Sequence, residues 1–389
     1  MNKMPIRYCT KCVMPSTRPG LTLDDSGVCN ACRNFESRGE VDWDSRRSEL
    51  LAMLEKYRCK TSSNWDCIVP VSGGKDSTTQ VIRLLQFGIN PLCVNATPCD
   101  ASELGRKNIE NIKGLGVDLI EISPNPVIRR KLNRIGLTRV GDIAWPEHAG
   151  IFTIPVRMAV QHEVPLIIWG ENSQNEYGGP AADSDNNVLD RRWLERFGGL
   201  LGLSLSELIG VEGLQLKDLI PYTYPSDESL KRVRVTGLFL GYYLPWDGYS
   251  NALLAQAHGF STYPDAVENS IVNYENLDNH QIGIHDYFKF LKLGFGRGSD
   301  IASLHVRRGR MTREDAIDLV HKRDGKFPWT YLGKPLQAIL DPLDMTVGEF
   351  EQVCDAFTNR NLFHTTDQGA LLKDRFGNLT KINYDNVSE

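Results

Sequence analysis

One loop constrains the fold of this chain more than any other feature. It reads Ser-Gly-Gly-Lys-Asp-Ser at residues 72–77 and directly follows the apolar run Cys67–Val71. A glycine pair lets the backbone turn tightly and approach an anion, and the free N–H groups at the start of a following helix point at that anion. Lys75 adds a positive charge, and the hydroxyl groups of Ser72 and Ser77 can donate to phosphate oxygens. The loop lacks the four-residue spacer of a Walker A loop, so it predicts a phosphate-binding loop of another kind.

After this loop, apolar runs alternate with helical patterns along the middle of the chain. A helical pattern follows the loop directly. The apolar runs predict strands at residues 67–71, 91–97, 117–123 and 165–169, and the later helical patterns cover residues 103–114, 127–139 and 146–162. Strands this apolar are covered by helices on both faces. The predicted fold class is therefore α/β, with a doubly wound parallel sheet.

Ligands of a doubly wound sheet bind at the carboxyl ends of its strands. This rule places residues 72–77, 95–100 and 170–179 around one crevice. Asn95 and Thr97 follow the second predicted strand and are candidate contacts for a bound nucleotide.

Four cysteines near the N-terminus have the spacing of a metal site. Cys9 and Cys12 form one Cys-x-x-Cys pair, Cys29 and Cys32 form another, and sixteen residues separate the pairs. Each pair can hold one tetrahedral ion from a tight turn, as in a zinc ribbon. Four thiolates also suit an iron–sulfur cluster. Disulfides are the remaining alternative, but no secretion signal precedes the segment. We favour structural zinc.

The rest of the chain divides into further segments. The C-terminal part carries helical patterns at residues 285–292, 312–321 and 346–358, with Thr312 and Thr346 as N-caps, and a short hairpin near residues 375–377. The predicted boundaries are a metal-binding ribbon at 1–40, a helical linker at 41–66, the α/β domain at 67–260 and a mainly helical region for substrate or partner binding at 261–389.

Charge and hydropathy narrow the possible partners. The formal net charge is −5, which gives no electrostatic footprint for wrapping nucleic acid. No stretch is apolar for long enough to span a bilayer. We therefore expect a cytoplasmic protein that does not bind membranes.

Several short strings resemble one known family. The loop at residues 72–77 resembles the signature of the PP-loop ATPases, which cleave ATP to AMP and pyrophosphate. Taken in order, the other strings are similar to the N-acetyl sugar amidotransferase family within that superfamily. They read CTKCVMPSTRPG at 9–20, GVCNAC at 27–32, WGEN at 169–172, EYGG at 176–179, GYY at 241–243, WD at 246–247, FGRGSD at 295–300 and RRGRMTRE at 307–314. The segment Thr97–Asp100 departs from the family pattern.

The resemblance implies a reaction and its substrates. The family converts an acetamido group of a bacterial surface sugar into an acetamidino group, in lipopolysaccharide O-antigen synthesis or in the making of pseudaminic- or legionaminic-type acids. ATP would adenylate the amide oxygen, and ammonia would then displace AMP from the O-adenylyl imidate. No cysteine outside the metal set lies in a Gly-x-Cys-x-Gly turn, so ammonia is expected from a separate glutaminase subunit.

The resemblance also implies roles for particular residues. ATP, with Mg²⁺, would contact the residues of the loop, namely Ser72, Gly73, Gly74, Lys75, Asp76 and Ser77. Lys75, Asp76 and Glu171 are the candidate catalytic residues. The candidate contacts for a nucleotide sugar are Glu171, Asn172, Arg297, Asp300, Arg307 and Arg310. Each has a simpler interpretation: Asp76 as a helix cap, Glu171 as a surface glutamate, and the C-terminal charges as salt bridges on exposed helices.

Two other classes of function fit parts of the same pattern. A PP-loop enzyme that thiolates tRNA would carry an iron–sulfur cluster on the four cysteines, although the acidic chain argues against a nucleic-acid substrate. A binding protein would use the ribbon for interactions and keep a vestigial ATP site, although the intact loop argues against that.

Overall fold

The computed structural model describes residues 6–59, 63–170, 188–189 and 201–382. Its centre is a six-stranded sheet in the order β3-β2-β1-β4-β6-β5. Five strands are parallel, and β5 pairs antiparallel with β6 at one edge. The strands are β1 Cys67–Pro70, β2 Pro91–Ala96, β3 Asp118–Ile122, β4 Leu166–Trp169, β5 Val188–Leu189 and β6 Thr236–Phe239. The four predicted strands are confirmed, each within one residue of its expected ends.

The strand order reverses at β1. Strands β2 and β3 lie on one side of β1, and β4 lies on the other. The crevice outside the carboxyl ends of β1 and β4 is therefore the topological switch point, where ligands of such sheets bind.

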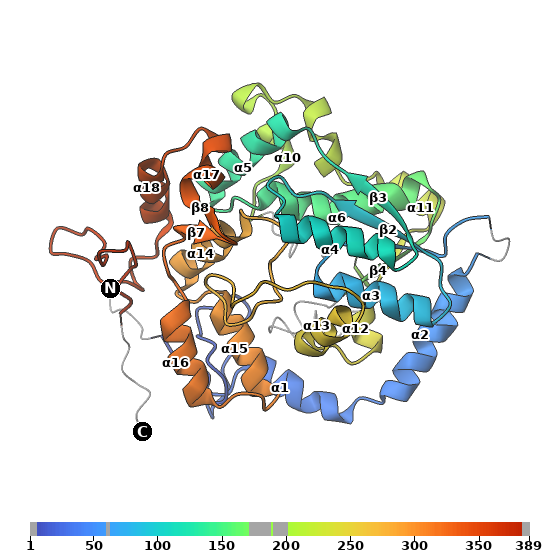
Figure 1. Ribbon diagram of the computed structural model, residues 1–389, viewed down its shortest axis with the longest axis horizontal. Helices are drawn as coiled ribbons and strands as arrows, with labels where there is room; N and C mark the ends of the chain where they lie inside the picture. The colour runs from blue at the N-terminus through green and yellow to red at the C-terminus, as the bar shows by residue number, and fades with distance from the viewer. Residues whose placement is uncertain (1–5, 60–62, 171–187, 190–200, 383–389) are drawn as a thin grey trace.

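Helices cover both faces of the sheet (Figure 1). Alternate residues of β1 divide between the faces, with Cys67 and Val69 in one apolar cluster and Ile68 in the other. The first cluster includes residues of α2 Trp43–Tyr57, α3 Lys75–Gln86, α4 Glu103–Gly114 and α12 Leu240–Tyr243, and the second includes residues of α6 Trp145–Gln161 and α11 Asp227–Val233. The doubly wound α/β fold is confirmed.

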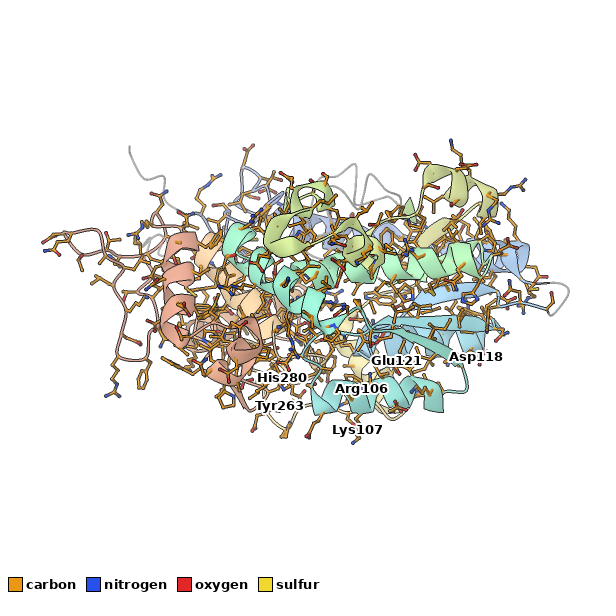
Figure 2. All side chains as sticks on the ribbon, turned by 90° about the horizontal axis from the view of Figure 1, so that it is seen from above. Arg106, Lys107, Asp118, Glu121, Tyr263 and His280 are labelled. Atoms are coloured by element: carbon orange, nitrogen blue, oxygen red, sulfur yellow. The ribbon has the colours of Figure 1, made fainter. Side chains whose placement is uncertain are left out.

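Local signals fix the ends of the helices around the sheet. Helix α4 begins after Ser102, whose Oγ accepts a hydrogen bond from the Gly105 N–H at 2.8 Å. Helix α5, Pro126–Val140, begins with proline and ends at Gly141, which is in the left-handed conformation. Arg106 of α4 reaches Glu121 of β3 at 2.6 Å, and Figure 2 shows these two side chains at the edge of the sheet.

The C-terminal region is mainly helical, as predicted. Its core packs aromatic side chains from several helices, among them Tyr287, Phe288 and Phe350. Thr312 and Thr346 cap the last two long helices, and a bridge between Lys373 and Leu379 closes the expected hairpin. The elements are α13 Gly248–Gln256, α14 Ile282–Leu293, α15 Arg297–Arg307, α16 Arg313–Arg323, β7 Thr330–Tyr331, β8 Lys334–Pro335, α17 Leu336–Leu340 and α18 Val347–Phe357.

Two segments form shorter elements than their sequence patterns suggest. Residues 227–243 contain three short elements in succession, α11, the strand β6 and α12, so this segment has neither a helical nor a strand periodicity throughout. Residues 189–220 carry helical spacing, but their described part forms only short elements: α10 Leu205–Leu208, η2 Val211–Gly213 and η3 Leu216–Tyr222, a 3₁₀ helix that runs two residues past that window. Pro221 lies inside the last of these, where it cannot donate to a longer helix. Within the described ranges, no helix is long and apolar enough to cross a membrane.

Candidate active site

A pocket of about 580 Å³ opens at the carboxyl ends of β1, β2 and β4. We call it the central pocket. The loop at residues 72–77 forms one wall, and Asn95 and Trp169 lie at the ends of two neighbouring strands. Residues 274–279 and Arg297 come from the C-terminal region, while Glu147, His148 and Phe152 come from α6. The predicted crevice is therefore a cavity shared between the sheet and the C-terminal helices.

The loop at residues 72–77 has a backbone that only glycine adopts easily. Gly73 has a φ of +80°, and a Cβ atom there would lie 2.8 Å from the backbone nitrogen of Ile109 in α4. Ser72 Oγ accepts from the Gly74 N–H at 3.2 Å, and Ser77 Oγ donates to the Gly74 carbonyl at 3.1 Å. The N-terminus of α3 thus begins at the pocket wall, in the geometry that binds phosphate.

Lys75 is buried in a network of alternating charge. Its Nζ lies 2.6 Å from Asp76 Oδ2 and 2.7 Å from Glu275 Oε1. Glu275 also pairs with Arg297, and Asn251 Nδ2 donates to Asp76 Oδ1 at 2.8 Å. Two carboxylates therefore balance two cations at the pocket wall. No sequence signal marks Glu275 or Asn251 as part of this site, because both lie more than 170 residues from the loop and carry no motif of their own.

The two candidate residues after β2 differ in their position. Asn95 is buried and lines the central pocket, where its Nδ2 donates to the Val71 carbonyl at 2.7 Å. Thr97 donates to Asn95 Oδ1 at 3.3 Å and is not among the described residues of the pocket wall. Glu171 and Asn172 lie outside the described residues. The chain enters that segment through Gly170, which does line the pocket.

The four C-terminal candidates do not come together. Arg297 lines the central pocket. Asp300 is buried instead between Arg18 and Lys289, at 2.6 Å from each cation. Arg310 pairs with Asp247 on the surface, and Arg307 Nε donates to the Ser303 carbonyl of its own helix at 3.1 Å. Substrate contact by Asp300, Arg307 and Arg310 stays a prediction, since none of the three is among the described lining residues.

The four N-terminal cysteines converge as a metal site would require. All are buried, and their sulfur atoms lie within 4.8 Å of one another. The Cys9–Cys32 and Cys12–Cys29 pairs are 3.8 Å apart. That separation is what two thiolates have when each lies about 2.3 Å from one tetrahedral ion. Backbone N–H groups of Lys11, Cys12 and Cys29 point at Cys9 Sγ at 3.2–3.4 Å, which supports a thiolate there. Thiolates as a donor set suit zinc or iron, and the spacing of these four sulfur atoms is that of ligands on a single tetrahedral ion.

The segment that carries the four cysteines, residues 9–32, contacts the C-terminal helices, and we call it the cysteine module. Thr17 Oγ1 donates to the Leu293 carbonyl at 2.6 Å, and Arg18 pairs with Asp300. Arg313 Nε donates to the carbonyls of Cys9 and Cys12 at 3.3 and 3.2 Å. The module therefore supports the helix that carries Arg297 to the pocket.

Fold and site together define a doubly wound α/β protein with a glycine-rich loop at the switch point of its sheet and a group of four cysteines that could hold a metal ion. Residues 260–378 match the family described as "LPS biosynthesis protein WbpG-like, C-terminal domain". This match covers the C-terminal region alone, and it supports the amidotransferase family that the sequence motifs indicate.

Two solved structures resemble the chain at low similarity. The first is NMN synthetase from Francisella tularensis, with 15% identity and a TM-score of 0.26 over 50% of this chain and 92% of that chain. The second is the U34-tRNA thiolase NcsA from Methanococcus maripaludis with its [4Fe-4S] cluster, with 12% identity and a TM-score of 0.25 over 87% of this chain and 96% of that chain. A search of curated proteins gave no match.

Proposed function

We propose that this protein is an ATP-dependent, AMP-forming amidotransferase that converts an acetamido group of a nucleotide-activated sugar into an acetamidino group. The observation that carries the proposal is the loop at residues 72–77, whose helix N-terminus and buried Lys75 face the central pocket at the switch point of the sheet. The match of residues 260–378 to a lipopolysaccharide-biosynthesis family supports a sugar substrate.

The proposed reaction converts the amide oxygen into a better leaving group. An amide carbonyl is a poor electrophile, and its oxygen does not leave by itself. Attack of that oxygen on the α-phosphorus of ATP forms a P–O bond and releases pyrophosphate. Ammonia then adds to the activated carbon, AMP leaves with the former amide oxygen, and the amidine keeps the new nitrogen. The protein must hold the phosphates and the amide in line and balance the charge of the leaving pyrophosphate.

The residues of the pocket wall match these tasks. Lys75 and the backbone N–H groups at Gly73 and Gly74 would bind phosphate oxygens. Asp76 and Glu275 offer carboxylate oxygens beside Lys75, and these are the ligands that Mg²⁺ prefers. When bound there, Mg²⁺ would neutralise phosphate charge. Arg297 would contribute a second cation, or hold Glu275 in place.

The state of three thiols outside the metal set supports the proposal that ammonia comes from another protein. Burial raises the pKa of Cys93 to about 12 and that of Cys99 to about 11, and it raises the pKa of Cys67 well above its ordinary value. These thiols are protonated at neutral pH and are poor nucleophiles. We infer that ammonia comes from a partner glutaminase, so ammonium salts should support turnover while glutamine alone should not.

The reaction is tested with the purified full-length chain, ATP, Mg²⁺ and ammonium against a panel of N-acetylated nucleotide sugars. AMP, pyrophosphate and product mass are measured together. The proposal predicts AMP release that depends on one sugar and on ammonium, with oxygen replaced by NH in the product. AMP release with tRNA and a sulfur donor, but with no sugar in the panel, would instead establish a thiolation enzyme.

A further inference from the structure

A second group of metal-ligating side chains lies at another wall of the central pocket. Asp142 Oδ1 is 2.8 Å from His285 Nδ1, and Asp142 Oδ2 is 3.4 Å from His148 Nδ1. The three donor atoms lie within 4.8 Å of one another. His148 lines the pocket, whereas Asp142 and His285 are not among its described lining residues. We call these three residues the Asp–His–His cluster.

Three separate elements bring the cluster together. Gly141, in the left-handed conformation, ends α5 and turns the chain, so that Asp142 follows directly. The Asp142 carboxylate is buried and accepts a hydrogen bond from the Ala144 N–H at 2.9 Å, which fixes its orientation. His148 lies in the first turn of α6 and His285 near the start of α14. The two imidazole rings meet edge to face, with centroids 4.9 Å apart.

We propose that Asp142, His148 and His285 bind a divalent transition-metal ion, with zinc as the best fit. One carboxylate and two imidazole nitrogens form a set that suits zinc and iron much better than magnesium. Three protein ligands leave a fourth position for water or an oxygen of a pocket ligand, which is the pattern of catalytic zinc sites.

The hydrogen bonding of His148 favours a metal over a simple Asp–His pair. Its Nδ1 atom is buried but makes no hydrogen bond to any described residue, despite lying near Asp142. A buried ring nitrogen without a hydrogen bond is costly, and a metal ion would satisfy it. Arg129 and Asn133 each donate a hydrogen bond of 2.8 Å to the neighbouring Glu147 carboxylate. Both oxygens of Glu147 therefore already have partners, and we do not include Glu147 among the metal ligands.

Metal binding by the Asp–His–His cluster does not depend on the proposed amidotransferase reaction, and it can be tested without measuring that reaction. It uses no residue of the loop at residues 72–77 and no cysteine. Because His148 is part of the pocket wall, a metal held there would present its open position to whatever ligand fills that side of the pocket. A hydroxyl or carbonyl oxygen is the expected donor for that position.

The test counts metal in the full-length chain. Wild type, His148→Gln, His285→Gln and the control His258→Gln are loaded with zinc, freed of excess ion by gel filtration and analysed for metal per chain. His258 is exposed, lies two residues beyond the end of α13 and belongs to neither group of metal-ligating side chains. The four-cysteine site is common to all four proteins. We expect each cluster variant to lose one equivalent of zinc relative to wild type and to His258→Gln.

A second measurement needs no variant. Zinc X-ray absorption of the wild-type chain should contain a nitrogen and oxygen shell at about 2.0–2.1 Å, beside any sulfur shell at about 2.3 Å. Equal zinc content in all four proteins, or a spectrum with a sulfur shell alone, would overturn the proposal. The cluster would then be a hydrogen-bonded Asp–His pair with a neighbouring histidine.

Discussion

At the residue scale, two carboxylates hold the ammonium group of Lys75 in position. Its Nζ contacts Asp76 and Glu275, and each carboxylate keeps a second partner, Asn251 or Arg297. Removal of the lysine therefore leaves no carboxylate without a partner. Because these partners remain, we expect the fold to survive the loss of Lys75, although the buried charges are then unbalanced and the free energy of unfolding falls.

We predict that Lys75→Ala lowers the rate of AMP formation by about 10²-fold or more, because phosphate charge loses its preorganised partner. The fold should remain intact. The measurement is AMP release with the active sugar, together with circular dichroism. Lys113→Ala is the matched control, since Lys113 lies on the exposed side of α4 and pairs with Glu110. Near-normal turnover of Lys75→Ala would refute the assigned site.

Asp300 shows the opposite case, a charged side chain whose surroundings indicate a structural role. Burial would raise its pKa, but Lys289 and Arg18 lower it to about 2. We predict that Asp300→Asn destabilises the protein by about 3 kcal/mol, because two half-buried cations lose the buried carboxylate that they share. Chemical denaturation measures this, with the exposed Asp318→Asn as control. A variant of unchanged stability but weakened sugar binding would restore Asp300 as a substrate contact.

At the scale of elements, the loop at residues 72–77 depends on its contact with α4. Gly73→Ala would force a φ of +80° on an alanine and bring its Cβ to 2.8 Å from Ile109 N. We predict a loss of more than about 1 kcal/mol of stability, together with loss of ATP binding. Gly88→Ala is the control, because Gly88 has a φ of +68° and no atom within 4 Å of the added Cβ. Equal effects of the two substitutions would show that the contact with α4 is unimportant.

Helix α13 begins at Asp247, which accepts from the Ser250 N–H at 3.1 Å and pairs with Arg308 and Arg310. Burial opposes the charge of Asp247, but Arg310, Ser250 and Arg308 lower its pKa from 3.8 to about 2. A lowered pKa means that the folded state favours the ionised form. The carboxylate therefore adds about 2 kcal/mol above pH 4, and this contribution is lost as the pH falls through about 2.

Stability measured from pH 7 down to pH 2 checks this expectation. Wild type should lose stability over the acid range, and Asp247→Asn should be less stable at neutral pH and show a shallower acid limb. Parallel curves for the two proteins would contradict the prediction.

At the scale of the whole molecule, the cysteine module links the N-terminus to the helices that reach the pocket. Its contacts to Leu293, Asp300 and Arg313 depend on the fold around the four cysteines. We predict that a strong metal chelator, or Cys12→Ser, lowers the melting temperature and loosens α15 and α16. Thermal unfolding and hydrogen exchange at residues 295–313 measure the two effects. Unchanged exchange after complete metal removal would show that the ion does not support these helices.

The amino-acid sequence determined the features that adjacent residues control. The glycine loop, the apolar strands, the threonine caps and the paired cysteines each depend on a few neighbouring positions. These features sufficed to predict the α/β sheet, its carboxyl-end crevice and the metal site. These patterns can be recognised in the sequence because backbone geometry and metal-ligand spacing require particular residue types at positions only a few residues apart.

Only the tertiary structure decided which distant side chains meet. Glu275 joins Lys75 across 200 residues, and His285 joins Asp142 across 143. Asp300 belongs to the same family-like string as Arg297, yet Asp300 pairs with Arg18 while Arg297 lines the pocket. The packing of helices on the sheet determines these contacts. The residues adjacent to each side chain do not indicate which distant side chain it will contact. The sequence therefore predicts a phosphate-binding loop, and only the fold decides which charged side chains surround that loop.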